Sequence, residues 1–156
     1  MLKISQKTEY ALRAMIELAA HPGQITSARE ISESQHIPLR FLEQQLGALS
    51  KAGLVESFRG AGGGCRLSGA PEDVLIADVV DAIEGPFYPM FCLDPGDHTC
   101  WQDARCGLQD LWAEVRVAVR GVFERVTLAE LATRHGRLAQ AQPVFSAEEI
   151  LSPGNA

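Results

Sequence analysis

Residues 59–64 read Arg-Gly-Ala-Gly-Gly-Gly, and this run of glycines constrains the fold more than any other segment of the chain. That many glycines cannot hold a regular element, because glycine gives up more conformational freedom on folding than any other residue. Strand-like segments flank the run, Leu54–Phe58 before it and Cys65–Ser68 after it. This pattern predicts a β-hairpin with a flexible, glycine-rich tip.

Two helices are expected directly before the hairpin. The first begins at Ser27, where Ser27 and Glu30 have the spacing of a capping box, and it ends near Gln35. After a short turn, Pro38 suits the first position of the second helix, which ends at about Ala52. The residues expected to face inward from this second helix are Phe41, Leu42, Leu46 and Leu49. Two short helices joined by a tight turn and followed by a glycine-tipped hairpin are typical of a winged helix-turn-helix.

Further helices are predicted around this unit. Helical spacing of apolar residues and capping signals place them at about Gln6–Ala20, Ile76–Glu84 and Leu108–Arg125, with a short last helix opened by a capping box at Thr127 and Glu130. Prolines, a glycine and acidic residues over 87–104 indicate a loop. From about residue 140 the chain is expected to be a loose tail.

Charge is distributed unevenly along the chain. The formal net charge is −6 at pH 7, yet the first 66 residues carry eight Lys and Arg against six Asp and Glu, whereas the rest carry six against fourteen. A mildly basic first part is compatible with nucleic-acid binding by that part. No uninterrupted apolar stretch approaches the roughly 20 residues that cross a bilayer, and the first residues hold polar groups throughout. We therefore expect a cytoplasmic protein with no membrane partner.

The second helix of the predicted helix-turn-helix begins with residues that suit DNA reading. In this motif that helix enters the major groove with its N-terminal residues at the base edges. Arg40 can contact a phosphate or a guanine, Glu43 can accept from a cytosine amino group, and Gln44 can pair with adenine. The candidate DNA-binding residues of this helix are Pro38, Leu39, Arg40, Glu43 and Gln44.

The hairpin and the start of the preceding helix supply further DNA-binding candidates. Glycine lets the backbone approach the sugar-phosphate surface closely, and arginine suits a narrow minor groove. Hydroxyl and N–H groups at the start of a helix can bind a phosphate. The candidates are Arg59, Gly60, Gly62, Gly63 and Arg66 in the hairpin, and Thr26 and Ser27 at the helix start. The alternatives are a hairpin that is merely mobile and a helix-turn-helix that binds only protein.

Three of the four cysteines lie close together in the predicted loop, as Cys92-x7-Cys100-x5-Cys106. In a reducing compartment such clustering points to metal or redox chemistry rather than to structural disulfides. Thiolates are soft ligands that favour iron–sulfur clusters and zinc, but three of them leave a four-ligand site incomplete. An incomplete thiolate set suits a sensor, with free thiols or a reversible disulfide as alternatives. Cys65 lies apart, in the hairpin, and is expected to be a small semi-buried hydrophobe.

The predicted long helix has an apolar stripe that is too wide for a lone surface helix. The stripe consists of Leu108, Leu111, Trp112, Val115, Val119, Val122 and Phe123. It can pack against its own domain, against the same helix of a second copy, or against both. A two-fold dimer sets the half-site spacing that palindromic operator DNA requires.

These observations define the expected architecture. We predict a mainly α fold with a small β-hairpin, in which residues 1–70 form a winged helix-turn-helix DNA-binding domain. Residues 71–139 are expected to hold a cluster-binding loop and a long dimerisation helix, and residues 140–156 a flexible tail. An enzyme is not expected, because the four histidines are scattered and no catalytic constellation is evident.

The sequence also resembles the winged-helix iron–sulfur transcription regulators typified by IscR, NsrR and RirA. The matching stretches are KISQKTEYALRAM, ISESQHIPLRFLEQQLGALSKAGLVES, FRGAGGGCRL and CGLQDLW, which span most of residues 1–132. The resemblance implies a repressor that binds palindromic DNA as a homodimer. It also implies an iron–sulfur cluster on Cys92, Cys100 and Cys106, 4Fe–4S in preference to 2Fe–2S.

The resemblance leaves the fourth cluster ligand and the signal open. Some members use a histidine three residues after the last cysteine, where this chain has Gln109, a poor ligand. Others use an acidic residue near the N-terminus of the partner subunit, and Glu9 matches that position unless it is simply a solvated first-turn glutamate. Asp94, Asp97 and His98 in the loop are alternatives. The first cysteine gap is closest to the iron-responsive RirA type and Glu9 to the nitric-oxide-responsive NsrR type. We expect sensing of iron or cluster status, with nitric oxide, redox state or a zinc or thiol centre as alternatives.

Overall fold

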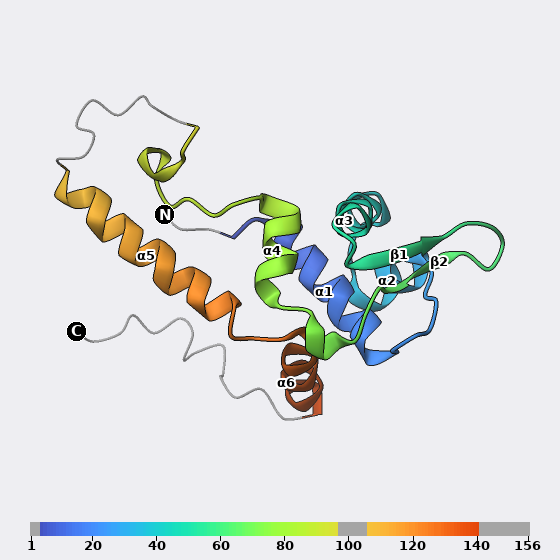
Figure 1. The fold of residues 1–156 in the computed structure, drawn as a ribbon. Helices are drawn as coiled ribbons and strands as arrows, with labels where there is room; N and C mark the ends of the chain where they lie inside the picture. Colours follow the sequence, from blue (N-terminus) through green and yellow to red (C-terminus); the bar gives the residue numbers. More distant parts are fainter. Residues whose placement is uncertain (1–3, 97–105, 141–156) are drawn as a thin grey trace, which may run out of the picture.

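The computed structural model describes residues 4–96 and 106–140, and within these ranges a single two-stranded hairpin projects from one side of a helical body (Figure 1). The elements are α1 (Gln6–Ala20), α2 (Ala28–Gln35), α3 (Leu39–Lys51), β1 (Val55–Phe58), β2 (Gly64–Leu67), α4 (Ile76–Glu84), α5 (Gly107–Phe123) and α6 (Leu128–Gln140), with 3₁₀ turns η1 (Pro71–Asp73) and η2 (Phe91–Leu93). The predicted fold class, a mainly helical chain with a winged helix-turn-helix, is confirmed.

Helix α1 lies at the centre of the hydrophobic core. Its buried residues recur at helical spacing: Thr8, Ala11, Ala14, Met15, Leu18 and Ala19. The alanines let neighbouring helices approach closely, and α3, α4 and α6 all pack against α1. Val79 of α4 and Leu128 of α6 are fully buried in the same core as α1 and α3. The core of the winged domain therefore extends beyond residue 70.

The helix-turn-helix forms as its local signals predict. The Ser27 hydroxyl accepts the Glu30 N–H at 3.2 Å, and the Glu30 carboxylate accepts the Ser27 N–H at 2.7 Å, which completes the capping box of α2. His36 ends α2 in the left-handed conformation, at a φ of 51°, and turns the chain toward α3. Pro38 precedes the first residue of α3 instead of being that residue, a difference of one position.

Phe41 is the one residue of α3 for which the predicted inward direction is wrong. Its side chain is 53% exposed, while the buried face of the helix consists of Leu42, Gln45, Leu46 and Leu49. These four follow the i, i+3, i+4, i+7 spacing of one helix face. Phe41 lies one residue, and hence about 100°, away from the start of that stripe.

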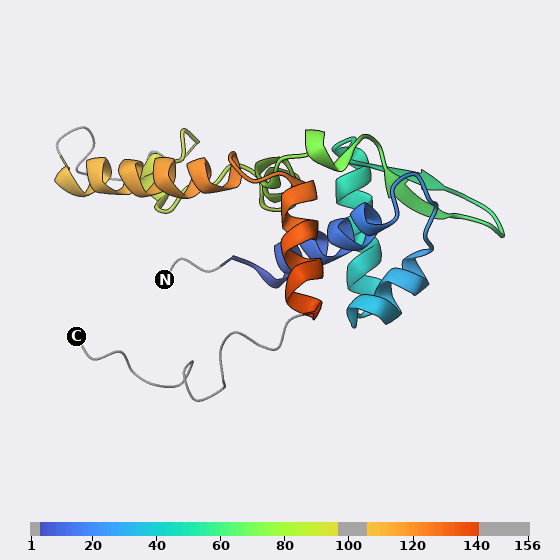
Figure 2. The ribbon, with the colours of Figure 1, turned by 90° about the horizontal axis from the view of Figure 1, so that it is seen from below.

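Helix α6, with 13 residues, is longer than the short helix expected. Leu75 and Thr127 form an isolated β-bridge, and the Leu128 N–H donates to the Val74 carbonyl at 2.8 Å. This bridge holds the start of α6 beside the start of α4, and the helix then crosses α1 and packs against it (Figure 2). The capping box predicts this helix, and its contact with α1 accounts for a length greater than expected.

Helix α5 stands apart from the core. Figures 1 and 2 show it extending from the body on the side opposite the hairpin. None of its residues is buried, and its most exposed apolar side chains are Leu108, Leu111, Val117 and Val122. Packing within the chain therefore leaves Leu108, Leu111 and Val122 of the predicted stripe exposed, while its other four residues are partly buried. No helix in the described ranges is both long and apolar enough to cross a membrane.

Candidate nucleic-acid interface and cysteine loop

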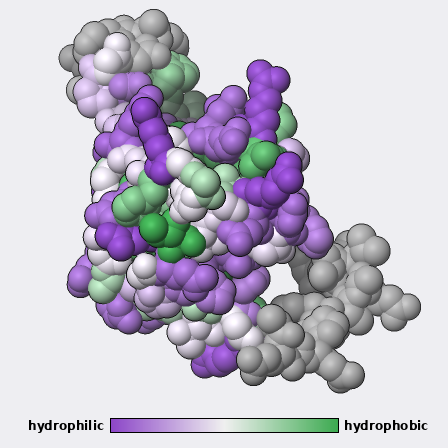
Figure 3. Space-filling view, turned by 90° about the vertical axis from the view of Figure 1, so that its right-hand side faces the viewer, coloured by the Kyte–Doolittle hydropathy of each residue, from purple (hydrophilic) through white to green (hydrophobic). Residues whose placement is uncertain are grey.

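The start of α3 presents its side chains at the surface beside the hairpin. The five residues predicted to bind DNA there are all at least partly exposed: Pro38, Leu39, Arg40, Glu43 and Gln44. A groove of about 360 Å³ separates α3 from the hairpin, with Glu43 and Gly47 on one side and Phe58 and Gly63 on the other. Figure 3 shows the side of the molecule from which the hairpin projects, where hydrophilic residues surround a small hydrophobic patch.

Thr26 and Ser27, the two candidates before α2, have most of their polar groups engaged within the protein. The Thr26 N–H and C=O pair with the C=O and N–H of Cys65, both at 2.9 Å, so this segment extends the hairpin. The buried Thr26 hydroxyl has no hydrogen-bond partner among the described residues. Ser27 is engaged in the capping box, so a phosphate contact by this residue would use its hydroxyl proton.

Two hairpin glycines are required by close approach of other backbone atoms. A Cβ atom at Gly64 would lie 2.4 Å from the Thr26 carbonyl oxygen, and one at Gly63 would lie 2.5 Å from the Phe58 carbonyl oxygen. A Cβ at Gly62 would meet nothing within 4 Å. The hairpin therefore requires glycine at positions 63 and 64 for steric reasons. At position 62 there is space for a side chain.

The two hairpin arginines have different surroundings. The Arg66 Nε donates to the Glu56 carboxylate at 2.9 Å, and the Arg66 guanidinium lies 5.1 Å from the centre of the Phe58 ring. The register explains this arrangement, because Glu56 pairs directly with Arg66 and Phe58 is two residues along the same face of β1. Arg59 is exposed at the hairpin tip and forms no ion pair within the described ranges. Its charge is thus available to a phosphate, whereas Arg66 would first have to leave Glu56.

Cys65 is buried in β2, 3% exposed, as expected of a small hydrophobe. Burial raises the pKa of its thiol to about 11. The thiol is therefore protonated and unreactive near neutral pH, in contrast to a metal ligand or a redox thiol.

Gln109 contacts the backbones of two of the three loop cysteines. Cys92 lies in η2 and Cys106 directly precedes α5, and both are half-buried. The Gln109 N–H donates to the Cys106 carbonyl at 2.9 Å, and its side-chain amide donates to the Cys92 carbonyl at 3.5 Å. Neither thiol is in a disulfide. Cys100 lies outside the described residues, and within them no three potential metal ligands gather.

The donor chemistry at the start of α5 fits an iron–sulfur cluster. Cys92 and Cys106 supply free, half-buried thiols, and thiolates are the ligands that such clusters use. Gln109, which was expected to be a poor ligand, has its amide group turned to the backbone of Cys92. Its contact orders the two cysteine backbones without occupying either thiol.

The candidate fourth ligands lie elsewhere. Glu9 is exposed on α1, and its carboxylate is 3.5 Å from the Arg13 guanidinium one turn later. Asp94 is exposed and accepts the Gly96 N–H at 2.8 Å. Asp97 and His98 lie outside the described residues. The Glu9 carboxylate is at the surface, where a second copy of the chain can reach it.

Glu84, the last residue of α4, ties the start of the cysteine loop to α1. The hydroxyls of Ser5 and Thr8 both donate to its carboxylate, the second at 2.5 Å, and Thr8 is fully buried. Burial raises the pKa of Glu84, but the hydrogen bonds from Ser5 and Thr8 and the charge of Lys7 lower it more, so the net pKa lies below its ordinary value. Glu84 is therefore an ionised acceptor at neutral pH.

A second set of contacts joins α5 to α4 and to the loop. Arg120 Nη1 donates to both carboxylate oxygens of Asp81, at 3.0 and 2.9 Å. The Arg116 guanidinium lies 4.5 Å from the centre of the Tyr88 ring. Sequence reasoning missed these residues and Glu84, because their partners are far away along the chain. The acidic residues on the otherwise apolar α4 are the one local signal that could have drawn attention to them.

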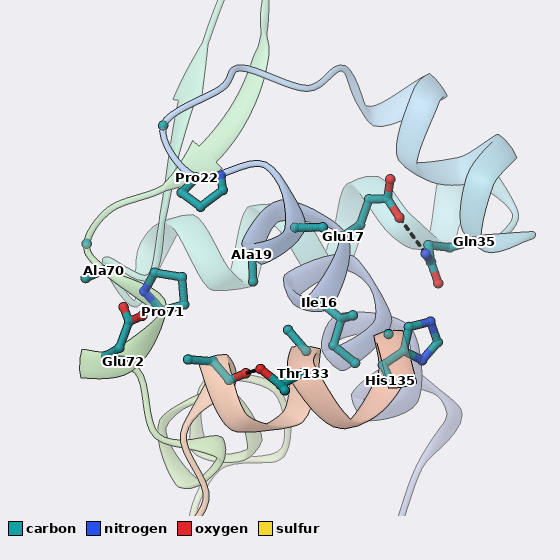
Figure 4. Close-up of a pocket in the computed structure, with 16 residues that line it drawn as sticks. Ile16, Glu17, Ala19, Pro22, Gln35, Ala70, Pro71, Glu72, Thr133 and His135 are labelled. Carbon is teal, nitrogen blue, oxygen red and sulfur yellow. Dashed lines mark hydrogen bonds between the residues drawn. The ribbon is translucent and has the colours of Figure 1, made fainter. Parts of the chain in front are cut away.

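A second groove, of about 740 Å³, lies between α1 and α6 (Figure 4). Small and apolar residues make up much of its lining, including Ile16, Ala19, Pro22, Pro71 and Ala132. Glu17, at one end, accepts a hydrogen bond from the Gln35 amide at 2.6 Å. None of the predicted site residues lines this groove, so the candidate site remains the hairpin side and the cysteine loop.

Comparison with known proteins agrees with this geometry. Residues 4–134 match the family described as "Rrf2: Iron-dependent Transcriptional regulator". The chain is 35% identical over 131 residues to the HTH-type transcriptional regulator NsrR of Bacillus subtilis (strain 168), which covers 83% of this chain and 90% of NsrR. It is 36% identical over 133 residues to the HTH-type transcriptional regulator IscR of Vibrio parahaemolyticus, which covers 85% of this chain and 78% of IscR.

Two solved structures share the fold over nearly the whole chain. The global cysteine regulator CymR of B. subtilis matches with a TM-score of 0.71 at 36% identity, over 86% of this chain and 98% of CymR. The IscR of T. potens matches with a TM-score of 0.71 at 32% identity, over 90% of this chain and 93% of that one. The similar proteins thus include regulators whose names point to different signals.

Proposed function

Because the chain belongs to the Rrf2 family of transcriptional regulators, we propose that it is a homodimeric repressor of palindromic operators that senses iron or iron–sulfur status. As a member of this family it is a DNA-binding transcription regulator and not an enzyme. The homodimer, the repression and the sensing step are proposals, and one observation supports the sensing step: Cys92 and Cys106 have free, partly buried thiols, and Gln109 hydrogen-bonds to the backbones of both.

The proposed DNA contacts follow from exposure. Arg40, Glu43 and Gln44 are exposed at the start of α3, the end that enters the major groove in this motif. The exposed Arg59 suits the minor groove beside them. Arg66 acts mainly within the hairpin, where its contacts with Glu56 and Phe58 stiffen the two strands.

The proposed dimer uses α5. Its exposed apolar side chains lie on a helix that extends away from the core, and burying them against the same helix of a second copy removes them from water. A two-fold axis along this contact places two winged domains at a fixed separation, as a palindromic operator requires.

The proposed sensor site consists of Cys92, Cys100 and Cys106, with Glu9 of the partner subunit as the fourth ligand. When bound, an iron–sulfur cluster supplies iron chemistry that responds to metal supply and oxidants. Within the chain, Gln109 orients the Cys92 and Cys106 backbones, and the exposed position of Glu9 makes it accessible to the partner's loop.

Contacts already present in the chain provide a route from this loop to the DNA-reading helices. Tyr88 in the loop contacts Arg116 of α5, Arg120 of α5 holds Asp81 of α4, and Glu84 at the end of α4 binds α1. Helix α1 packs directly against α3. A rearrangement of the loop would be passed to α3 through these contacts. The coupling free energy between two linked sites is typically about 1–3 kcal/mol.

Anaerobic purification with absorption spectroscopy and iron and sulfide analysis tests the sensor site. We expect a coloured protein with iron and acid-labile sulfide, and a cluster that Glu9→Ala makes markedly easier to remove with a chelator. Glu33→Ala, which removes an exposed carboxylate from α2, is the control. A colourless protein with zinc and no sulfide would overturn the cluster, and a Glu9→Ala cluster as stable as wild type would remove Glu9 as a ligand.

Operator binding at fixed salt concentration tests the reading helix. Arg40→Ala is expected to weaken specific binding by about 1–3 kcal/mol, roughly 5- to 150-fold. Arg134→Ala, an exposed arginine of α6, is the control for loss of one positive charge. Equal effects of the two changes would contradict the placement of α3 in the groove.

Nitric-oxide sensing is the second candidate, and the exposed acidic Glu9 favours it through the resemblance described above. Operator binding is measured after the anaerobic protein receives either nitric oxide or an iron chelator. Release from DNA by nitric oxide, with no response to iron depletion, supports this candidate over iron sensing.

A further inference from the structure

On helix α3, two residues one turn apart have the opposite burial from what their polarity predicts. Gln45, a polar residue, is only 5% exposed, whereas Phe41, one turn earlier, is 53% exposed. The Gln45 side-chain amide donates to the Phe41 carbonyl at 3.3 Å, which satisfies part of its polarity inside the protein. Burying an amide costs free energy, and exposing a phenyl ring forgoes hydrophobic burial. Contacts within the single chain therefore do not explain why position 41 carries an aromatic side chain.

The surroundings of Phe41 are those of the proposed DNA-reading surface. Arg40 precedes it in the chain, and Gln44 follows it by three residues, so Phe41 and Gln44 are neighbours along the helix surface. Both Arg40 and Gln44 are exposed. The apolar face of α5 lies on the opposite side of the molecule (Figures 1 and 2), so the proposed dimer contact does not cover Phe41.

Among the groups at the edges of base pairs, the thymine 5-methyl is the apolar one, and phenylalanine is one of the side chains that contact it. We propose that Phe41 is a specificity-determining residue that contacts the methyl group of a thymine next to the bases reached by Arg40 and Gln44. This inference rests on the proposed operator binding by α3. It adds an apolar reading contact to a surface whose other candidates are polar.

The experiment compares thymine with uracil, which differs only by that methyl group. The full-length protein first selects its preferred sequence from a library of random DNA duplexes, and each thymine of that sequence is then replaced singly by deoxyuridine. Wild type is expected to lose about fourfold in affinity at one position of each half-site, the value of one buried methyl group. Phe41→Ala is expected to bind the thymine duplex about as weakly as wild type binds the uracil duplex, with no further loss on uracil.

Two further variants make the test decisive. Phe41→Leu, which keeps an apolar side chain and the helix, is expected to retain part of the response to uracil. Leu138→Ala, an exposed apolar residue of α6, is the control and should keep the full wild-type response. If wild type and Phe41→Ala respond equally to every uracil, or if Phe41→Ala changes the oligomeric state, this inference is overturned. If wild type selects no sequence at all, the proposed function falls with it.

Discussion

At the scale of single residues, Glu84 shows how a charge far from any predicted site links two parts of the fold. Its pKa is lowered in the folded chain, because hydrogen bonds from Ser5 and Thr8 outweigh the effect of burial. A carboxylate whose folded pKa is depressed stabilises the fold above its unfolded pKa, and that stability is lost as the pH falls through the folded pKa. The contact therefore strengthens the fold at neutral pH and weakens it in acid.

We predict that Glu84→Gln is less stable than wild type at neutral pH and that the difference shrinks as the pH falls below about 4.5, the ordinary glutamate value. The measurement is chemical denaturation at a series of pH values. Glu33→Gln, which neutralises an exposed glutamate of α2, should follow the wild-type profile. A gap between Glu84→Gln and wild type that stays constant with pH would contradict the ionised contact.

At the scale of elements, the hairpin depends on its contact with the segment before α2. Thr26 pairs with Cys65 on the edge of β2, and this brings the Thr26 carbonyl to where a Cβ of residue 64 would lie. The same hairpin stacks Arg66 on Phe58 across the strands. The wing is therefore anchored at its base by close packing, while Gly62 near its tip has open space around it.

We predict that Gly64→Ala lowers the free energy of unfolding by roughly 1–3 kcal/mol, because the methyl group overlaps a backbone carbonyl that cannot move easily. Gly62→Ala, in the same glycine run, should change it by less than about 0.5 kcal/mol. Urea denaturation of both variants provides the comparison. Equal stabilities would show that the hairpin does not pack on Thr26 as described.

At the scale of the whole molecule, the chain has two ends with different properties. The hairpin and α3 form one end, and α5 with the 3₁₀ turn η2 forms the other, with the α1 core between them (Figure 1). Three residues of the apolar stripe of α5 are exposed: Leu108 by 61%, Leu111 by 50% and Val122 by 49%. The proposed dimer would cover these side chains with the same helix of a second copy.

We predict that Leu111→Glu converts the proposed dimer to a monomer, because Leu111 is an exposed residue of the apolar stripe and the change places a charge in the proposed contact. Analytical ultracentrifugation measures the state, and circular dichroism checks that the helices remain. Leu138→Glu puts the same charge on an exposed apolar position of α6 and should leave the dimer intact. A Leu111→Glu protein that stays dimeric would exclude the apolar stripe of α5 as the interface.

Much of the fold could be predicted because its signals are local. Capping boxes at Ser27 and Thr127 are present as expected, and helix α4 has the predicted bounds. The cysteine loop could be recognised from spacing and resemblance, although Cys100 lies outside the described residues. The direction of Phe41 could not be predicted, since an apolar residue at the edge of a helical stripe can turn to either side.

The sequence by itself therefore determined the helices, the glycine hairpin and the cluster of loop cysteines, because each depends on residues a few positions apart. Only the tertiary structure decided that Gln45 is buried while Phe41 is exposed, and that Glu84 binds Ser5 and Thr8. These outcomes depend on how α1, α3 and α4 pack together. Packing brings residues that are distant along the chain into contact. Neither the periodicity of apolar residues nor the spacing of motifs predicts which of these residues will be in contact.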